Sequence, residues 1–386
     1  MAVEDRPLIL SIMQITRQGL SRVAAKLWGI AQMAMLIYGS LFIAGHMSNP
    51  ANIPVFPIFY GALFLVLAGW MFVIVVHELG HAVAAWLGGW KIAVIGVSRL
   101  TIWPTQRRFR FGLPAFPGLG GAILPIPPET GNWRKSYLVM VLGGPIANLV
   151  LSICLVIAVL GGLQSEFWIS YLEVVAAISA LTFAVNLLPL SQGLSKFDGA
   201  RIAMALSGQD LEPWARLTRL GAEMTAPKRA REWNPDYVEA VKQDYAAGHG
   251  EGGLGLLLCQ YYLDCGDVTA ARKALAWAAE RLGRIDNIRI SEAFMLAHFD
   301  GDIEGAETLL TQIKSRALKK QPAYLISRAV IASHASDTQF FSVAIERARA
   351  ALRRVPFATS ADFEFLEELT RKPKSRVPAG EVFVAS

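Results

Sequence analysis

The stretch His77-Glu78-Leu79-Gly80-His81 decides how this sequence of 386 residues is interpreted, because it sets two histidines four positions apart. On a helix, residues at this spacing share one face, so both imidazoles can reach one metal ion. Glu78 begins one step round the helix and can reach a water molecule beside that ion. Two ligands and a general base are the arrangement of a hydrolytic zinc site.

The motif comes directly after an apolar run, Ile58–Val76, which is long enough to cross a bilayer. Hydrophobic residues make up 53% of the chain and charged residues only 18%, which indicates a membrane part joined to a polar part. Four apolar spans are predicted: Leu27–Ile43, Ile58–Val76, Ser136–Leu160 and Phe167–Leu188. A zinc hydrolase motif at the end of a membrane helix points to proteolysis in or at the membrane.

Lysines and arginines predict the orientation of these spans. Residues 1–26 are basic and are predicted to be an amphipathic cytoplasmic leader, and the segment between the second and third spans is basic as well. The segments near Asn49–Asn52 and Gly161–Glu166 contain neither lysine nor arginine. By the positive-inside rule, both termini and the long middle segment are cytoplasmic. The three cysteines indicate no disulfide framework, and the layout favours a bacterial inner membrane.

The middle segment is predicted to form short strands at the inner membrane surface. Lys91–Val97 and Arg99–Trp103 have strand-like composition, and Arg108–Phe111 alternates with a period of two. We interpret the arginines as setting topology and contacting lipid headgroups of the bilayer. No nucleic acid partner is expected, since no nucleic-acid-binding fold accompanies these residues.

The sequence becomes helical and charged after Gln209. Residues 209–250 are predicted as a linker, 251–353 as tetratricopeptide-like helical repeats, and 354–386 as a tail. The repeats rest on aspartates and apolar residues that recur with a period near 35: Asp267, Asp302, Asp337, Leu275, Leu310 and Ile345. A generic helical bundle remains the alternative. The predicted fold is thus an α-helical membrane protein with about four transmembrane helices in residues 27–208, a short cytoplasmic β-rich loop, and an all-α helical-repeat soluble domain.

A hydrolytic zinc usually has a third protein ligand and one open position. Asp198, in Phe197-Asp198-Gly199-Ala200, lies just beyond the cytoplasmic end of the fourth span. His77 lies at the cytoplasmic end of the second span, so the predicted topology brings both residues to the inner side of the bilayer. An ordinary helix N-cap is the alternative reading of Asp198.

Three motifs together resemble the site-2 protease family of intramembrane zinc metalloproteases. They are His77-Glu78-Leu79-Gly80-His81-Ala82, then Gly143-Gly144-Pro145-Ile146-Ala147-Asn148, then Asn186-Leu187-Leu188-Pro189 followed by Asp198-Gly199. Gly120-Gly121 is similar to a further family segment, more weakly. The resemblance covers roughly residues 58 to 208. In one departure, Ser191–Phe197 lengthens the connection between the last two elements relative to many relatives.

The resemblance implies that His77, His81 and Asp198 bind one zinc ion, with Glu78 as the general base. It also implies that Asn148 and Asn186 line the site, where an amide can help to stabilise the oxyanion. For both asparagines, a hydrogen bond that only holds the helices together remains the alternative.

The predicted function is an intramembrane zinc endopeptidase that cuts a membrane-embedded substrate near the cytoplasmic face, in regulated intramembrane proteolysis. The helical repeats would recruit a substrate, a protein adaptor or another copy of the chain. The competing hypothesis is a catalytically inactive membrane scaffold that acts through its repeats. A membrane di-iron oxidase is disfavoured, because such sites need many histidines and the membrane half has only His46, His77 and His81.

Overall fold

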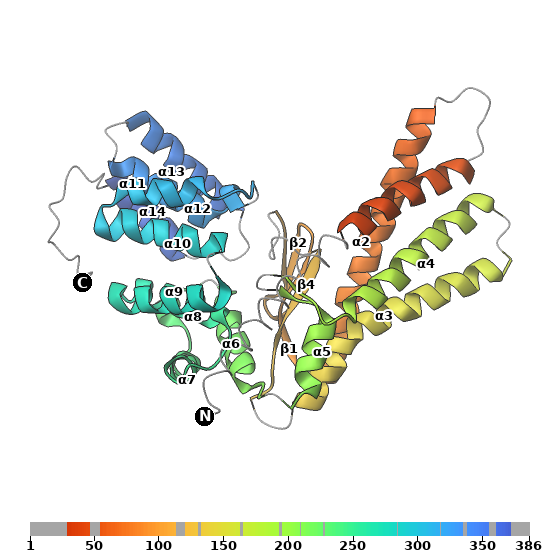
Figure 1. Ribbon diagram of the computed structural model, residues 1–386, viewed down its shortest axis with the longest axis horizontal. Helices are drawn as coiled ribbons and strands as arrows, with labels where there is room; N and C mark the ends of the chain where they lie inside the picture. The colour runs from red at the N-terminus through yellow and green to blue at the C-terminus, as the bar shows by residue number, and fades with distance from the viewer. Residues whose placement is uncertain are drawn as a thin grey trace, which may run out of the picture. The chain divides into compact units, whose positions relative to one another are not determined.

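The computed structural model divides the chain into two compact units, residues 1–90 with 128–209 and residues 91–127 with 210–386 (Figure 1). The structure describes residues 29–46, 55–112, 120–129, 133–162, 165–192, 195–208, 210–226, 228–283, 285–316, 318–334, 338–354 and 360–371. The predicted leader, residues 1–26, lies outside the described residues.

The first unit is built on helices that are long and apolar enough to cross a membrane, and the described residues contain four of them. These are Gly29–His46, α2 (Val55–Leu87), α3 (Arg134–Leu160) and α4 (Glu166–Asn186). The prediction of four spans is therefore confirmed, and α2 continues through the His-Glu motif as expected. Apolar side chains from several of these helices form one buried cluster that includes Ile43, Val66, Val73, Val174 and Ile178.

α2 and α3 cross at very close range because both carry glycine at the contact. A Cβ added at Gly80 would lie 2.6 Å from the Cβ of Ala147, and one added at Gly143 would lie 2.6 Å from the Cβ of Ala84. Ordinary contacts between carbon atoms are about 3.5–4.0 Å, so larger residues would push the helices apart. Small residues therefore allow close helix packing here.

The connection from α4 to α5 (Asp198–Leu206) contains a short hairpin of β5 (Ser191–Gln192) and β6 (Ser195–Lys196). The amide of Phe197 donates to the carbonyl of Leu190 at 3.0 Å and closes the base of this hairpin. The longer connection noted in the sequence thus forms a local hairpin, and α5 still begins close to the end of α4.

The second unit contains an antiparallel sheet with the strand order β3-β2-β1-β4. Its strands are β1 (Lys91–Val97), β2 (Leu100–Trp103), β3 (Arg108–Phe111) and β4 (Gly121–Ile126). The first three were predicted. β4 was not, because its glycine and Pro125 are typical of a loop. β4 is an edge strand, where a residue without a backbone N–H is tolerated.

Helix α6 (Glu212–Glu223) packs on this sheet. Trp103 is fully buried, and Ala222 of α6 contacts the same small apolar cluster. The side-chain amide of Gln106, from the short 3-10 turn Pro104–Gln106, donates to the carbonyl of Thr225 at 3.3 Å, just beyond α6. The sheet therefore shares its apolar face with a helix that begins more than eighty residues after the last strand.

The rest of the second unit is helical. It comprises a 3-10 turn (Ala230–Glu232), α7 (Pro235–Ala246), α8 (Gly252–Asp264), α9 (Val268–Leu282), α10 (Asp286–Met295), a π-helical turn (Leu296–Asp300), α11 (Ile303–Thr311), a second 3-10 turn (Leu318–Lys320), α12 (Pro322–His334), α13 (Thr338–Leu352) and α14 (Ser360–Arg371). Successive helices pack as the pairs α8 with α9, α10 with α11 and α12 with α13.

Two of the recurring aspartates cap the second helix of a pair. The carboxylate of Asp267 accepts from the amide of Ala270 at 2.9 Å, and that of Asp302 accepts from the amide of Gly305 at 2.9 Å. Asp337 lies outside the described residues. The recurring apolar positions are all buried: Leu275, Leu310 and Ile345. That the three pairs are tetratricopeptide-like stays a prediction.

The predicted linker at 209–250 is wrong as a description of the structure, because α6 and α7 lie within it. Leu220, Trp233 and Val238 belong to the same buried cluster as Leu254 of α8, so this stretch is part of the folded unit. The prediction followed prolines and short helices, which look like a linker when their packing partners are not known. The predicted tail likewise contains α14, whose Leu366 is fully buried.

Candidate metal centre

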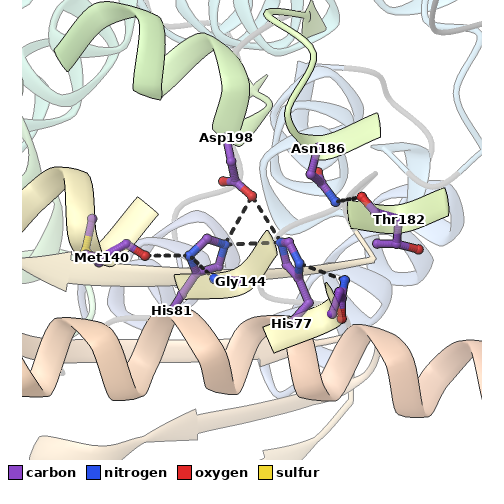
Figure 2. Close-up of polar contacts among 8 residues, drawn as sticks. His77, His81, Met140, Gly144, Thr182, Asn186 and Asp198 are labelled. Atoms are coloured by element: carbon purple, nitrogen blue, oxygen red, sulfur yellow. Dashed lines mark hydrogen bonds and ion pairs between the residues drawn. The ribbon is translucent and has the colours of Figure 1, made fainter. Parts of the chain in front are cut away.

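Helix α2 presents the central motif to the interior of the first unit. His77, Glu78 and His81 are 7%, 6% and 7% exposed. The two imidazoles extend from one face of α2, one turn apart, as the spacing predicted. Figure 2 shows both rings directed towards Asp198.

Asp198 is the first residue of α5 and meets the two histidines although it lies 121 residues after His77. The glycine that follows it allows this placement: a Cβ at Gly199 would overlap the carbonyl groups of Leu187 and Leu188. The first turn of α5 therefore rests directly on the backbone that ends α4. Asp198 is not an N-cap, because the cap position is Phe197 and no side chain caps this helix.

Three ligand atoms converge on one point. Nε2 of His77 lies 3.1 Å from Oδ2 of Asp198, Nε2 of His81 lies 3.3 Å from the same oxygen, and the two Nε2 atoms are 3.1 Å apart. Zinc held tetrahedrally at about 2.0–2.1 Å separates its ligands by about 3.3–3.4 Å, since a tetrahedron's edge is about 1.63 times the bond length. The observed spacing therefore fits a single zinc ion bound by these three residues.

His81 is oriented from behind by the backbone of α3. Its Nδ1 lies 2.9 Å from the carbonyl oxygen of Met140 and 3.2 Å from the amide nitrogen of Gly144. The shorter contact requires a proton on Nδ1, which donates to the carbonyl and leaves the lone pair of Nε2 free for a metal. Gly144 has a second role, because any side chain there would collide with the His81 ring.

His77 also has a polar partner behind it. Nδ2 of Asn148, on α3, lies 3.0 Å from Nδ1 of His77, and Asn148 is fully buried. The structure thus places Asn148 against a candidate ligand, on the side of the ring away from Asp198.

The charge state of Asp198 suits metal binding. Burial by itself raises the pKa of its carboxyl group, but attraction to His81 and hydrogen bonds with both imidazoles hold that pKa well below its usual range. The carboxylate therefore stays ionised at neutral pH, which is the form that binds a metal.

Glu78 and Asn186 occupy different positions relative to this cluster. The carboxylate of Glu78 lies within electrostatic reach of His81, Asp198 and Arg201. The amide of Asn186 donates instead to the carbonyl of Thr182 at 3.0 Å, one turn back on its own helix (Figure 2). The structure therefore gives no support to Asn186 as a contact of the ligand set.

The sequence missed the backbone contributions to the site. The Met140 carbonyl carries no distinctive side-chain pattern, and only the family-like motif that contains Gly144 pointed to this part of α3. The need for glycine at 199 was visible only as part of the Asp-Gly pair.

Comparison with known proteins matches part of the membrane core to one family. Residues 65–165 match the model of Peptidase family M50. The chain is 31% identical over 167 residues to "Putative zinc metalloprotease Rip2" of Mycobacterium tuberculosis, covering 40% of this chain and 63% of that protein. It is 34% identical over 120 residues to the protein of the same name from Mycolicibacterium smegmatis, covering 28% of this chain and 43% of that protein.

The chain thus spans less than two thirds of the length of the curated relatives it matches. No solved structure matches it. The resemblance to site-2 proteases drawn from the sequence motifs is confirmed over residues 65–165, which contain the first two motifs.

Proposed function

We propose, from the match to Peptidase family M50 and the converging ligand set, that this chain is a zinc endopeptidase cleaving membrane-embedded substrates near the cytoplasmic face. One observation carries the proposal: His77, His81 and Asp198 bring three ligand atoms to within 3.1–3.3 Å of one another. Glu78, the candidate base, is buried beside them on the same helix.

The chemistry follows from the arrangement of these side chains. A zinc ion held by His77, His81 and Asp198 would supply Lewis acidity, which would lower the pKa of water towards neutrality and stabilise negative charge on the scissile carbonyl oxygen. Glu78 accepts the proton of the attacking water and delivers it to the leaving amine. Protein encloses the site on several sides, which keeps the polar groups away from lipid.

The side of the membrane is inferred from charge. The motif lies near the end of α2, and the segment that follows contains Lys91, Arg99 and Arg107. The positive-inside rule favours a cytoplasmic position for this segment, and hence for the candidate metal centre and both termini. The same topology is expected in a bacterial inner membrane.

The test is a comparison of metal content and proteolysis among variants of the full chain. Glu78→Gln should keep zinc and lose cleavage, because it removes the base and leaves all three ligands. Asp198→Ala should weaken zinc binding. Glu173→Gln is the matched control, since Glu173 is an exposed carboxylate within the fourth span and should retain both properties. Zinc is measured on the purified protein, and cleavage by cataloguing new protein termini in the host membranes.

Two outcomes would overturn the proposal. One is the absence of stoichiometric zinc in the wild-type protein. The other is an unchanged set of membrane-protein fragments in cells that carry Glu78→Gln. The second outcome, with cellular function intact, would favour the alternative of an inactive scaffold.

The helical repeats are proposed to recruit a substrate or a protein adaptor, because stacked helix pairs offer extended binding surfaces.

Strand β3 is proposed to bind an extended segment of the substrate. It lies at one edge of the sheet, and Phe109 and Phe111 are 74% and 75% exposed. An extended substrate segment can add to such an edge by main-chain hydrogen bonds.

A further inference from the structure

Asn148 has an environment that a purely structural asparagine does not need. Its side chain is fully buried in α3, and its Nδ2 lies 3.0 Å from Nδ1 of His77. Its Oδ1 has no hydrogen-bond partner among the described residues. Its backbone carbonyl accepts from the hydroxyl of Ser179 on α4 at 2.8 Å, which fixes this part of α3.

The amide of Asn148 can occupy the same space in two orientations, because its oxygen and nitrogen are nearly alike in size. With the nitrogen towards His77, the amide donates to Nδ1, and the ring proton must then sit on Nε2. That proton would point at Asp198 and prevent Nε2 from binding a cation. With the oxygen towards His77, the amide accepts a proton from Nδ1, and the lone pair of Nε2 is free.

The number of hydrogen bonds does not choose between the two orientations, because each leaves one amide atom buried without a partner in the described part of the chain. The ligand chemistry does choose. Only the orientation with the oxygen towards His77 lets Nε2 join Nε2 of His81 and Oδ2 of Asp198 as ligands, and their spacing of 3.1–3.3 Å fits one ion.

We infer that Asn148 is a positioning residue for the zinc ligand His77: its Oδ1 accepts the Nδ1 proton and holds Nε2 towards the ion. This inference rests on the proposed zinc site. It gives His77 the same kind of support that His81 receives from the Met140 carbonyl at 2.9 Å, so each imidazole has one oxygen behind it. It also separates Asn148 from the oxyanion role that the family resemblance implied, since the amide acts through His77.

Partners of this kind typically contribute about 10-fold to 100-fold to metal affinity. Three variants of the full chain in detergent test the inference by zinc affinity, measured by competition with a chelator. Asn148→Leu keeps the volume and removes the acceptor. Asn148→Asp keeps the shape, and its ionised carboxylate can accept a hydrogen bond but cannot donate one. Ser152→Ala is the control, because Ser152 is a buried residue of the same helix that bonds to the carbonyl of Ala176, away from the histidines.

We expect Asn148→Leu to weaken zinc binding about 10-fold to 100-fold. Asn148→Asp and Ser152→Ala should stay within about threefold of the wild type. Equal zinc affinity in Asn148→Leu and the wild type would overturn the inference while leaving the proposed zinc site intact. Loss of zinc in a folded Asn148→Asp variant would also overturn the inference. It would mean that zinc binding depends on the N–H donor of the Asn148 amide and not on its oxygen. A wild-type protein that binds no zinc would overturn the proposed function itself.

A second measurement applies if Asn148→Asp does not fold. In zinc-loaded protein labelled with ¹⁵N-histidine, the Nδ1 proton of His77 should exchange slowly with solvent in the wild type and faster in Asn148→Leu. Equal exchange rates in the two proteins would overturn the inference.

Discussion

Gly144→Ala tests how closely α3 fits against the His81 ring. A Cβ at this position would lie 2.7 Å from both Cδ2 and Cε1 of His81 and closer still to Nε2. Ordinary contacts between carbon atoms are about 3.5–4.0 Å, so the ring must move by about 1 Å. Functional side chains need to be held within about 0.5 Å of their productive geometry. We therefore expect zinc affinity to fall at least about 100-fold, or about 2.7 kcal/mol.

The assay is zinc affinity by chelator competition, with thermal unfolding of the zinc-free protein measured in parallel. Gly61→Ala is the matched control, because it makes the same change in α2 at a position with nothing within 4 Å. Alanine favours a helix over glycine by about 1 kcal/mol, so a loss of zinc in Gly144→Ala cannot come from weaker helix formation. Wild-type zinc affinity in Gly144→Ala would refute the close contact between α3 and His81.

Two further predictions concern the second unit. In a Cys154→Ala background, a thiol reagent at pH 8 should label the exposed Cys265 and leave Cys259 unlabelled until the protein is denatured, as peptide mass spectrometry would show. Burial raises the pKa of Cys259 from 9.0 to about 12, which lowers its thiolate fraction about a thousandfold at this pH. Phe109→Glu combined with Phe111→Glu should reduce capture of membrane substrate in crosslinking experiments and leave zinc content unchanged. Undiminished capture would rule out strand β3 as the docking edge.

The membrane part of the fold could be predicted from sequence because its determinants are local. An apolar run of sufficient length requires a helix in lipid, whatever surrounds it. The spacing of His77 and His81 likewise fixes their common face within a single helix. Asp198 was predicted as a ligand by combining the membrane topology with a known motif. The topology places Asp198 and His77 on the same side of the membrane but does not give the distance between them.

The features that the sequence did not reveal depend on contacts between distant segments. β4 forms a strand because it pairs with β1, whereas its glycine and Pro125 are by themselves typical of a loop. The sequence of α6 and α7 is typical of a linker because their apolar residues pack against other elements, α8 and α9 for both helices and the sheet for α6. The orientation of the Asn148 amide depends on His77 in another helix, so no local pattern could specify it.

The packing of α6 on the sheet has a consequence for the order in which this protein is made. Ribosomes synthesise β1 to β4 before the third and fourth membrane spans, whereas α6 emerges only after both. The apolar face around Trp103 therefore stays exposed until α6 is made, while the third and fourth membrane spans are still being inserted. A chain shortened to end at residue 209 would never receive that cover, and we expect it to be prone to aggregation and degradation even with every candidate zinc ligand present.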